Sequence, residues 1–201
     1  HKEYRRQRQM CIRDSLRAIG YWAAHLLDQA EHHPEPQVRR QADQLAQLLT
    51  PIIKAFFTEQ GFRQASNALQ VFGGYGYVAE FAIEQTLRDS RIAMIYEGSN
   101  EIQANDLLLR KVLGDGGQGF ALLLEQLRDE AGHGAQVPEC VGFARSLADL
   151  AEALQALVAQ VQQWALEDAE YPYRAAGDFL ALCGLSPVSY THLRAHETGR
   201  N

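Results

Sequence analysis

Apolar side chains recur at intervals of three and four residues along most of this chain, which is the spacing of one face of an α-helix. The longest apolar stripe runs from Val38 to Phe57 and continues to Phe72. A bend is predicted within it at Pro51, because proline removes a backbone donor. Other helices are predicted over residues 19–27, 79–87, 99–112, 120–130 and 141–164, with a break at 33–36, an irregular passage over 88–96, and linkers at 114–117 and 132–138. Since no strand-like alternation stands out, the predicted fold is all-α: an up-down helical bundle followed by a truncated second helical segment.

The two ends of the chain are related to each other in a way that is not a protein feature. Residues 10–15 can be written in codons whose reverse complement encodes Val-Ser-Tyr-Thr-His, the sequence of residues 188–192. Inverted copies at both ends are typical of translated adapters from a transposon-based sequencing library. We therefore interpret residues 1–15 and 188–201 as non-native scars and leave them out of fold reasoning. The alternative is a genuine basic arm and a genuine polar tail.

The charge of the remaining body excludes one class of partner. The 201-residue chain has 19 basic and 25 acidic side chains, a net charge of −6. The two scars hold seven of the basic and three of the acidic residues, so residues 16–187 keep 12 and 22 and carry a net charge of −10. An acidic body without a basic stripe argues against nucleic-acid binding. A ligand that bears phosphate would have to be held by local groups rather than by overall charge.

Cysteine and histidine usage points to neither a disulfide framework nor a metal site. Outside the scars the chain has two cysteines, Cys140 and Cys183, which are far apart in sequence. That usage is typical of a reducing compartment. The histidines lack the two-ligand spacing that a metal site needs, and no apolar run is long enough to span a membrane. The sequence therefore predicts a cytoplasmic protein with no metal.

Glu97 is the best candidate for a catalytic group. It follows the apolar run 92–96 and precedes Gly98 and Ser99, which look like the start of a helix. A carboxylate walled by apolar side chains has its charged form disfavoured, and this raises its pKa toward that of a working base. The alternative interpretation is an acid that only complements the positive end of a helix dipole.

Gly73, Gly74 and Gly76 form a cluster that permits two interpretations. Gly74, Gly76 and Ala79 formally match a dinucleotide-binding fingerprint, but that fingerprint requires a strand to enter it, and here a helical pattern enters. Glycines after a helix are commonly caps, because a left-handed conformation costs them no Cβ clash. The alternative is that the bare backbone amides of Gly73 and Gly74 approach a phosphate closely.

Several motifs occur together, in order, between residues 70 and 103. They are Gln-x-x-Gly-Gly-x-Gly-Tyr at 70–77, an acid at Glu84, Arg-Asp-x-Arg-Ile at 88–92, Ile-Tyr-Glu-Gly-Ser at 95–99, and Ile-Gln at 102–103. This order and spacing resemble the C-terminal helical domain of the acyl-CoA dehydrogenases, flavoenzymes that oxidise an acyl thioester at its α and β carbons. The resemblance outweighs the helix-dipole interpretation of Glu97, because it does not rest on one residue.

The resemblance continues upstream to about Leu16 and suggests a branch of the family. The phrases AAHLLDQAEHHP and LLTPIIKAFFTEQGF look closest to an enlarged bacterial branch, which includes 3-methylmercaptopropionyl-CoA dehydrogenase-like enzymes and adds a further helical domain. The resemblance implies a family C-terminal domain over residues 16–115 and the truncated start of the additional helical domain over 116–187. It also implies a bacterial cytoplasmic location and a role in fatty acid metabolism and β-oxidation.

The resemblance implies roles for three residues at the reacting carbons. Glu97 matches the base that removes the pro-R α-proton while hydride leaves the β-carbon for flavin N5. The backbone amide of the same residue would polarise the thioester carbonyl, which is stabilisation by a preorganised donor. Tyr96 would line the acyl pocket, and Gly98 would lie against the substrate.

The resemblance also implies FAD as cofactor. The matching positions are Gln70, Val71, Phe72, Gly73 and Gly74, for the FAD of a neighbouring subunit, and Ser99, Asn100 and Glu101, for a flavin-contacting turn. Sharing a flavin in this way implies a homodimer or a dimer of dimers, with electron-transfer flavoprotein as the electron acceptor. Ser99 stands where relatives carry threonine and keeps the hydroxyl. Glu101 stands where many carry glutamine or glycine, and a carboxylate turned toward the flavin phosphates would repel them.

The family's N-terminal helical domain and its β-domain, which bind most of the flavin and the CoA, have no counterpart in this sequence. We therefore expect the chain to be a fragment that is inactive alone. Two other hypotheses remain: an acyl-CoA oxidase of the same fold, which uses oxygen as acceptor, and a catalytically silent helical oligomerisation module. Retention of Glu97 together with Gly98 weighs against the silent module, since packing does not need a carboxylate there.

Overall fold

The computed structural model describes the backbone of residues 2–198 and the side chains of residues 12–186. The elements in chain order are α1 (Lys2–His32), α2 (Pro36–Phe72), the 3₁₀ turns η1 (Gly73–Tyr77) and η2 (Ala79–Phe81), α3 (Ile83–Ile92), α4 (Asn100–Asn105), the π-helical segment η3 (Asp106–Leu113), α5 (Gln118–Gly134), α6 (Val141–Glu167) and α7 (Tyr171–Thr198). No strand occurs in the described backbone, and the predicted all-α bundle is confirmed.

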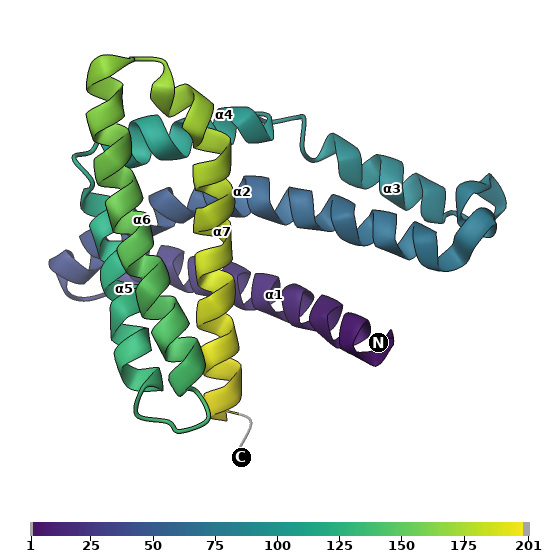
Figure 1. The fold of residues 1–201 in the computed structure, drawn as a ribbon, viewed down its shortest axis with the longest axis horizontal. Helices are drawn as coiled ribbons and strands as arrows, with labels where there is room; N and C mark the ends of the chain where they lie inside the picture. The colour runs from purple at the N-terminus through teal and green to yellow at the C-terminus, as the bar shows by residue number, and fades with distance from the viewer. Residues whose placement is uncertain (1, 199–201) are drawn as a thin grey trace.

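The helices form two regions that share α2 (Figure 1). In the first, which we call the bundle, α5, α6 and α7 stand side by side and pack across one end of the α1–α2 pair. In the second, the C-terminal part of α2 turns back at its end and pairs with α3. We call this hairpin the arm: residues 57–92, which include the second half of α2, η1, η2 and α3. The arm extends away from the bundle.

The core lies in the bundle and draws on residues from both halves of the sequence. Its fully buried side chains include Leu48, Leu49, Leu107, Leu123, Leu147 and Phe179. Burying one side chain of this kind stabilises a fold by about 1.5–3 kcal/mol. Residues on either side of the Gly114–Gly117 turn belong to one continuous cluster, so α5, α6 and α7 share their core with α2 and η3.

Two glycines in α7 experience different surroundings, and the contrast shows how closely α7 approaches α2. A Cβ added at Gly184 would lie 2.3 Å from Cδ2 of Phe56 on α2, closer than any real contact. A Cβ added at Gly177 would meet nothing within 4 Å. Glycine at position 184 therefore permits a helix crossing that any other residue would push apart.

The predicted helix boundaries are mostly confirmed, with corrections around α3 and α5. The chain breaks between α1 and α2 at residues 33–35 as predicted, and α2 is continuous through Pro51. The prediction of one helix over residues 79–87 is wrong. A 3₁₀ turn ends at Ala82, where φ is +55°, and a new helix begins at Ile83. The irregular passage starts later than predicted, because α3 runs to Ile92. The linker before α6 begins after Gly134, since α5 includes Gly132.

The segments interpreted as scars are helical where the structure describes them. The backbone of α1 begins at Lys2 and that of α7 ends at Thr198. The side chains of residues 1–11 and 187–201 lie outside the described part. The interpretation of residues 1–15 and 188–201 as non-native scars concerns their origin, and it stays a prediction.

Candidate functional site

Gly73 ends α2 as a helix cap at the tip of the arm. Its φ is +61°, and its backbone amide donates to the carbonyl of Gln70. Positive φ is the conformation that glycine adopts without a Cβ clash, so the cap interpretation is confirmed for this residue. A Cβ added at Gly73 or Gly74 would meet nothing within 4 Å, so the backbone at the tip is open to an approaching group.

Gly76 has a different role, because it lets the chain fold back on α2. It is buried, and a Cβ there would lie 2.6 Å from the carbonyl oxygen of Leu69. The tip is therefore a tight reversal. Gln70, Val71, Phe72, Gly73 and Gly74 are all exposed on it, and Val71 is 84 % exposed. No strand enters this cluster in the described backbone, so the dinucleotide-fold interpretation is excluded.

Glu97 lies in a loop of unusual backbone conformation between α3 and α4. Its φ is +54°, and that of Gly98 is +88°. A left-handed conformation costs a non-glycine residue about 1–2 kcal/mol, and such strain is concentrated at functional sites. A Cβ at Gly98 would also lie 2.8 Å from Nε2 of Gln103. Residue 98 must therefore be small and left-handed, and the geometry explains why Glu97 is followed by glycine.

The predicted apolar enclosure of Glu97 is wrong for this chain by itself. Glu97 is exposed, and no ion pair engages its carboxylate within the part of the chain whose side chains are described. The flanking Ile95 and Tyr96 are 52 % and 51 % exposed, and Ile92 is exposed as well. Sequence shows that these neighbours are apolar, but enclosure requires a second surface, and α3 and α4 do not supply one.

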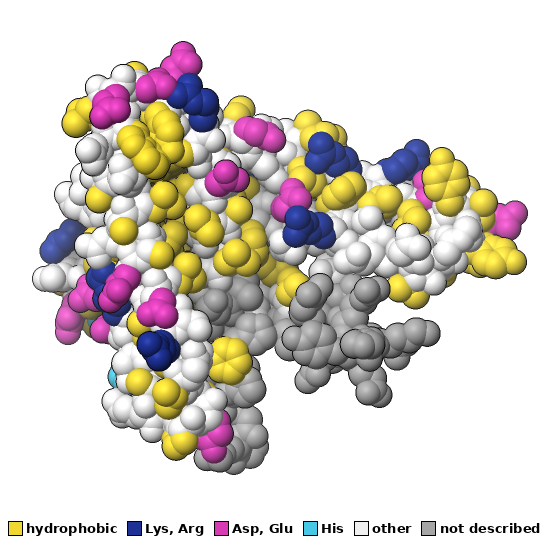
Figure 2. Space-filling model, in the orientation of Figure 1, with side chains coloured by type: hydrophobic (Ala, Val, Ile, Leu, Met, Phe, Trp, Pro, Cys, Tyr) yellow, Lys and Arg dark blue, Asp and Glu magenta, His cyan; other side chains and the backbone are white. Residues whose placement is uncertain are grey.

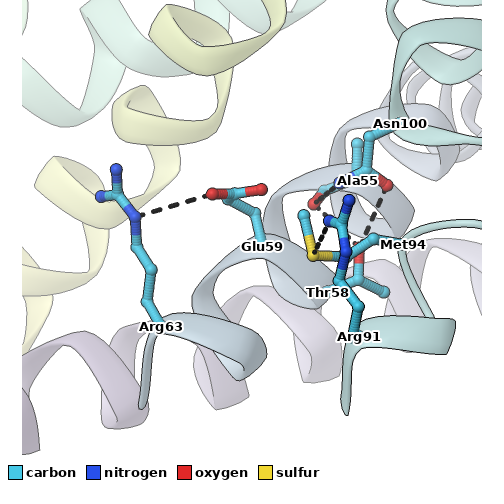
Figure 3. Close-up of polar contacts among 7 residues, drawn as sticks. All are labelled: Ala55, Thr58, Glu59, Arg63, Arg91, Met94 and Asn100. Carbon is cyan, nitrogen blue, oxygen red and sulfur yellow. Dashed lines mark hydrogen bonds and ion pairs between the residues drawn. The ribbon is translucent and has the colours of Figure 1, made fainter. Parts of the chain in front are cut away.

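Hydrogen bonds from α2 hold the start of α4 beside this loop. Asn100 is the centre: its Nδ2 donates to the carbonyl of Ala55 at 3.3 Å, and its Oδ1 accepts from the hydroxyl of Thr58 at 3.2 Å (Figure 3). Lys54 Nζ donates to the carbonyl of Gly98 at 2.5 Å and lies 3.4 Å from Asn100 Oδ1. We call Lys54, Thr58 and Asn100 the clamp.

Sequence reasoning missed Lys54 and Thr58 and placed Asn100 among the flavin contacts. The amide group of Asn100 is engaged within the chain, so its side chain is a structural tie between α2 and α4. A signal for Lys54 was present: a lysine stands in the apolar stripe of α2, immediately after Ile52 and Ile53. A charge in such a stripe needs a polar partner.

Glu101 is exposed in the first turn of α4. The pKa of its carboxyl lies below the ordinary value, because it accepts hydrogen bonds from its own backbone amide and from Ser99, and the charges of Arg91 and Lys54 add to this. The carboxylate is therefore directed to the amino end of the helix. Ser99 begins α4 from an extended conformation, with φ −60° and ψ 164°.

The candidate flavin contacts do not meet within one chain. Residues 70–74 lie at one end of α3 and residues 99–101 beyond the other. The ten residues of α3 alone span about 15 Å. A single copy of this chain therefore presents two separate contact surfaces.

A pocket of about 350 Å³ lies between α2, α4 and α7, next to the clamp. Phe56, Leu180 and Ala181 form its apolar wall, and Glu59 and Arg63 lie at its polar side. Arg63 Nε pairs with Glu59 at 3.6 Å (Figure 3). Among the described residues, no group of three or more His, Cys, Asp or Glu side chains is placed to hold a metal ion. None of the described helices is long and apolar enough to cross a membrane.

Comparison with known proteins places this geometry in a family. Residues 7–111 match the family model "Acyl-CoA dehydrogenase, C-terminal domain", so the match begins inside the segment 1–15 that was set aside. The chain is 36 % identical over 189 residues to 3-methylmercaptopropionyl-CoA dehydrogenase of Ruegeria pomeroyi, covering 92 % of this chain and 32 % of the relative. It is 31 % identical over 173 residues to the broad-specificity linear acyl-CoA dehydrogenase FadE5 of Mycobacterium tuberculosis, covering 81 % of this chain and 28 % of the relative.

A solved structure shares the fold. The crystal structure of Caenorhabditis elegans ACDH-11 in complex with C11-CoA superposes with a TM-score of 0.76 at 19 % identity and covers 92 % of this chain and 31 % of its own. The chain thus spans about a third of the length of the curated relatives it matches. Since the family model covers more than half of the sequence, the chain belongs to the acyl-CoA dehydrogenase C-terminal domain family.

Proposed function

We propose that this chain is the C-terminal helical part of an FAD-dependent enzyme that introduces a double bond between the α and β carbons of an acyl-CoA thioester. The observation that carries the proposal is the loop at Glu97 and Gly98, where a carboxylate is held exposed on a left-handed backbone. Strained backbone of this kind is concentrated at functional sites. The family membership and the dehydrogenase names of the curated relatives support the same activity.

Glu97 is the proposed base for the α-proton. Its carboxylate makes no ion pair with the side chains of residues 12–186, so it can accept a proton from a substrate that lies over the loop. The backbone amide of Glu97 would donate to the thioester oxygen and acidify the α-C–H bond. Gly98 would lie against the substrate, and Tyr96 would line the acyl pocket. The enclosing surface that raises the basicity of Glu97 would come from the rest of the enzyme.

The open backbone at Gly73 and Gly74 fits a flavin held from the arm tip, since nothing within 4 Å of an added Cβ blocks an approach there. When bound, FAD supplies the acceptor for the β-hydride. Gln70, Val71, Phe72, Gly73 and Gly74 would contact the FAD of a second subunit. Ser99 and the backbone of residues 100–101 would face the chain's own flavin. Glu101 lies in the first turn of α4, where hydrogen bonds from its own backbone amide and from Ser99 lower the pKa of its carboxyl.

The separation of the two contact surfaces supports a homodimer or a dimer of dimers as the working assembly, because one chain cannot complete a flavin site with both. We propose residues 16–115 as the family domain and 116–187 as the start of the additional helical domain. Electron-transfer flavoprotein is the proposed acceptor, and the proposed location is the cytoplasm. The chain alone would be inactive, since it holds neither the CoA site nor most of the flavin site.

The test uses the full-length flavoprotein that contains this chain, as wild type, Glu97→Gln and Glu125→Gln. Glu125 is an exposed acid of α5 outside the site and serves as the matched control. Each protein is titrated anaerobically with acyl-CoA while the absorbance of oxidised flavin is recorded. We expect bleaching in the wild type and in Glu125→Gln, and a rate lower by at least about 10³-fold in Glu97→Gln with flavin retained.

Each contrary result points to a defined alternative. Equal bleaching in all three proteins would show that Glu97 is not the base. Stoichiometric hydrogen peroxide release during aerobic turnover would identify an acyl-CoA oxidase instead. If the full-length protein bound no flavin, the catalytically silent oligomerisation module would replace the proposal.

A further inference from the structure

Lys54 connects the loop that carries Glu97 to α2. It lies near the middle of α2, and its side chain is half-buried. Its ammonium group donates to the carbonyl of Gly98 at 2.5 Å and approaches Oδ1 of Asn100 at 3.4 Å. Lysine has three donors and no acceptor, so one ammonium can satisfy both oxygens.

Packing alone cannot place this loop. Ile95, Tyr96 and Glu97 are exposed in the chain, and buried apolar area is what normally fixes a segment. The loop has local hydrogen bonds: the amide of Asn100 donates to the carbonyl of Met94 at 3.2 Å, and Gln103 Nε2 donates to the carbonyl of Glu97 at 3.3 Å. These bonds shape the loop relative to α4 but do not join it to α2.

The bond from Lys54 differs in two respects. It reaches from another helix, 44 residues away in sequence, and its donor is charged, which makes it stronger than the neutral bonds around it. Its acceptor is the residue directly after Glu97. The carbonyl of Gly98 follows two successive left-handed residues, so fixing its direction fixes the path of the backbone through Glu97.

We infer that Lys54 is a positioning residue for the proposed base: by holding the Gly98 carbonyl it fixes the left-handed loop and aims the Glu97 carboxylate at the substrate. This inference rests on the proposed function. Lys54 binds the backbone carbonyl of Gly98, and no ion pair of the Glu97 carboxylate occurs among the described side chains. Thr58 and Asn100 complete the attachment one turn further along α2.

The experiment compares the full-length flavoprotein with Lys54→Met, Lys54→Arg, Glu97→Gln and the matched control Lys111→Met. Lys111 also donates to a side chain of α2, Oε1 of Gln47 at 3.1 Å, but it lies on η3, away from the loop. Three measurements are made: steady-state kinetics with acyl-CoA for kcat and KM, the isotope effect with α-deuterated substrate, and amide hydrogen exchange of the substrate-free protein over residues 92–100.

For Lys54→Met we expect kcat to fall about 10- to 100-fold, because a displaced base loses its near-attack geometry. KM should change by less than about threefold, and the α-deuterium isotope effect should rise as proton removal becomes slower. Exchange over residues 92–100 should accelerate about tenfold, the loss expected for one hydrogen bond to a charged donor. Lys54→Arg should recover part of each change, since it keeps a charged donor, and Lys111→Met should match the wild type.

The inference is overturned if Lys54→Met keeps wild-type kcat and exchange. It is also overturned if exchange accelerates equally throughout α2 and α4 without a change in the isotope effect, because that pattern indicates general destabilisation. Should Lys54→Met fail to fold, Lys54→Arg supplies the same three measurements, with wild-type values in all of them counting against the inference. Failure of the proposed function looks different: Glu97→Gln would then retain wild-type kcat.

Discussion

The bundle and the arm are both built from helices but bury their apolar side chains to very different extents. In the bundle, Leu107, Leu123 and Leu147 are completely buried. In the arm, α3 has no buried residue, and the tip exposes Val71, Tyr75 and Tyr77. Figure 2 shows hydrophobic side chains gathered at the outer end of the arm. An apolar surface of this kind marks an interaction site, and the candidate flavin contacts at residues 70–74 lie on it.

The difference teaches that stability and proposed function are located in different places along one helix. The first part of α2 packs against α5 and α7, and its C-terminal part projects from them with α3 as its partner. The clamp lies where the two regions meet, so the proposed base is attached to α2 at that boundary. A longer enzyme would cover the arm, which agrees with the third of the relatives' length that this chain spans.

The largest expected effect comes from truncating a buried side chain in the core of the bundle. Leu107→Ala in the bundle should lower the free energy of unfolding by about 2–5 kcal/mol, because a cavity replaces a fully buried side chain. Val71→Ala at the arm tip should change it by less than about 0.5 kcal/mol. Urea denaturation of the two variants measures both values, and similar losses in the two would break the distinction between bundle and arm.

A smaller effect tests how closely α7 of the bundle packs against α2. Gly184→Ala should destabilise the chain by about 1–3 kcal/mol, because its Cβ would be forced against the ring of Phe56. Gly177→Ala on the same helix is the matched control and should be neutral or stabilising by up to about 1 kcal/mol, since its Cβ meets nothing within 4 Å. Thermal unfolding separates the two. A stabilised Gly184→Ala would mean that α7 does not pack against Phe56.

The smallest expected effect is the pH dependence of stability that arises from Glu101, at the boundary between the bundle and the arm. The pKa of Glu101 is lowered in the folded chain from its ordinary 4.5, chiefly by its own backbone amide. A depressed folded pKa makes the ionised carboxylate stabilising above the unfolded pKa, and the contribution is lost as pH falls through the folded pKa. The stability difference between wild type and Glu101→Gln should therefore be present at pH 7 and shrink below pH 4.5. Acid titration at constant urea measures it, and a difference that stays constant to pH 3 would contradict the assignment.

Part of the site could be read from sequence because it depends on local chemistry. Glycine at 73 predicts a cap, and its φ is positive in the structure. The motif that contains Glu97 identified the family, which the family match confirms. The roles assigned to the individual site residues stay predictions.

The clamp and the exposure of Glu97 could not be read in this way. Lys54 meets Gly98 across 44 residues, and nothing in the spacing of the two indicates that they touch. The apolar residues before Glu97 suggested an enclosure, yet Tyr96 is half-exposed. Likewise, Asn100 matched a flavin contact by position, and only its bonds to Ala55 and Thr58 reveal the structural tie.

The sequence by itself determined the helical period, the glycine positions that allow left-handed turns, and the motif that marks the family, because each of these depends on neighbours along the chain. The tertiary structure decided which apolar faces are buried and which polar groups meet. Periodicity shows that a face is apolar but carries no information on whether another surface covers it. Apolar side chains at helical spacing therefore became fully buried core in α5 and α6, whereas Ile83 and Leu87 of α3 are only half-buried.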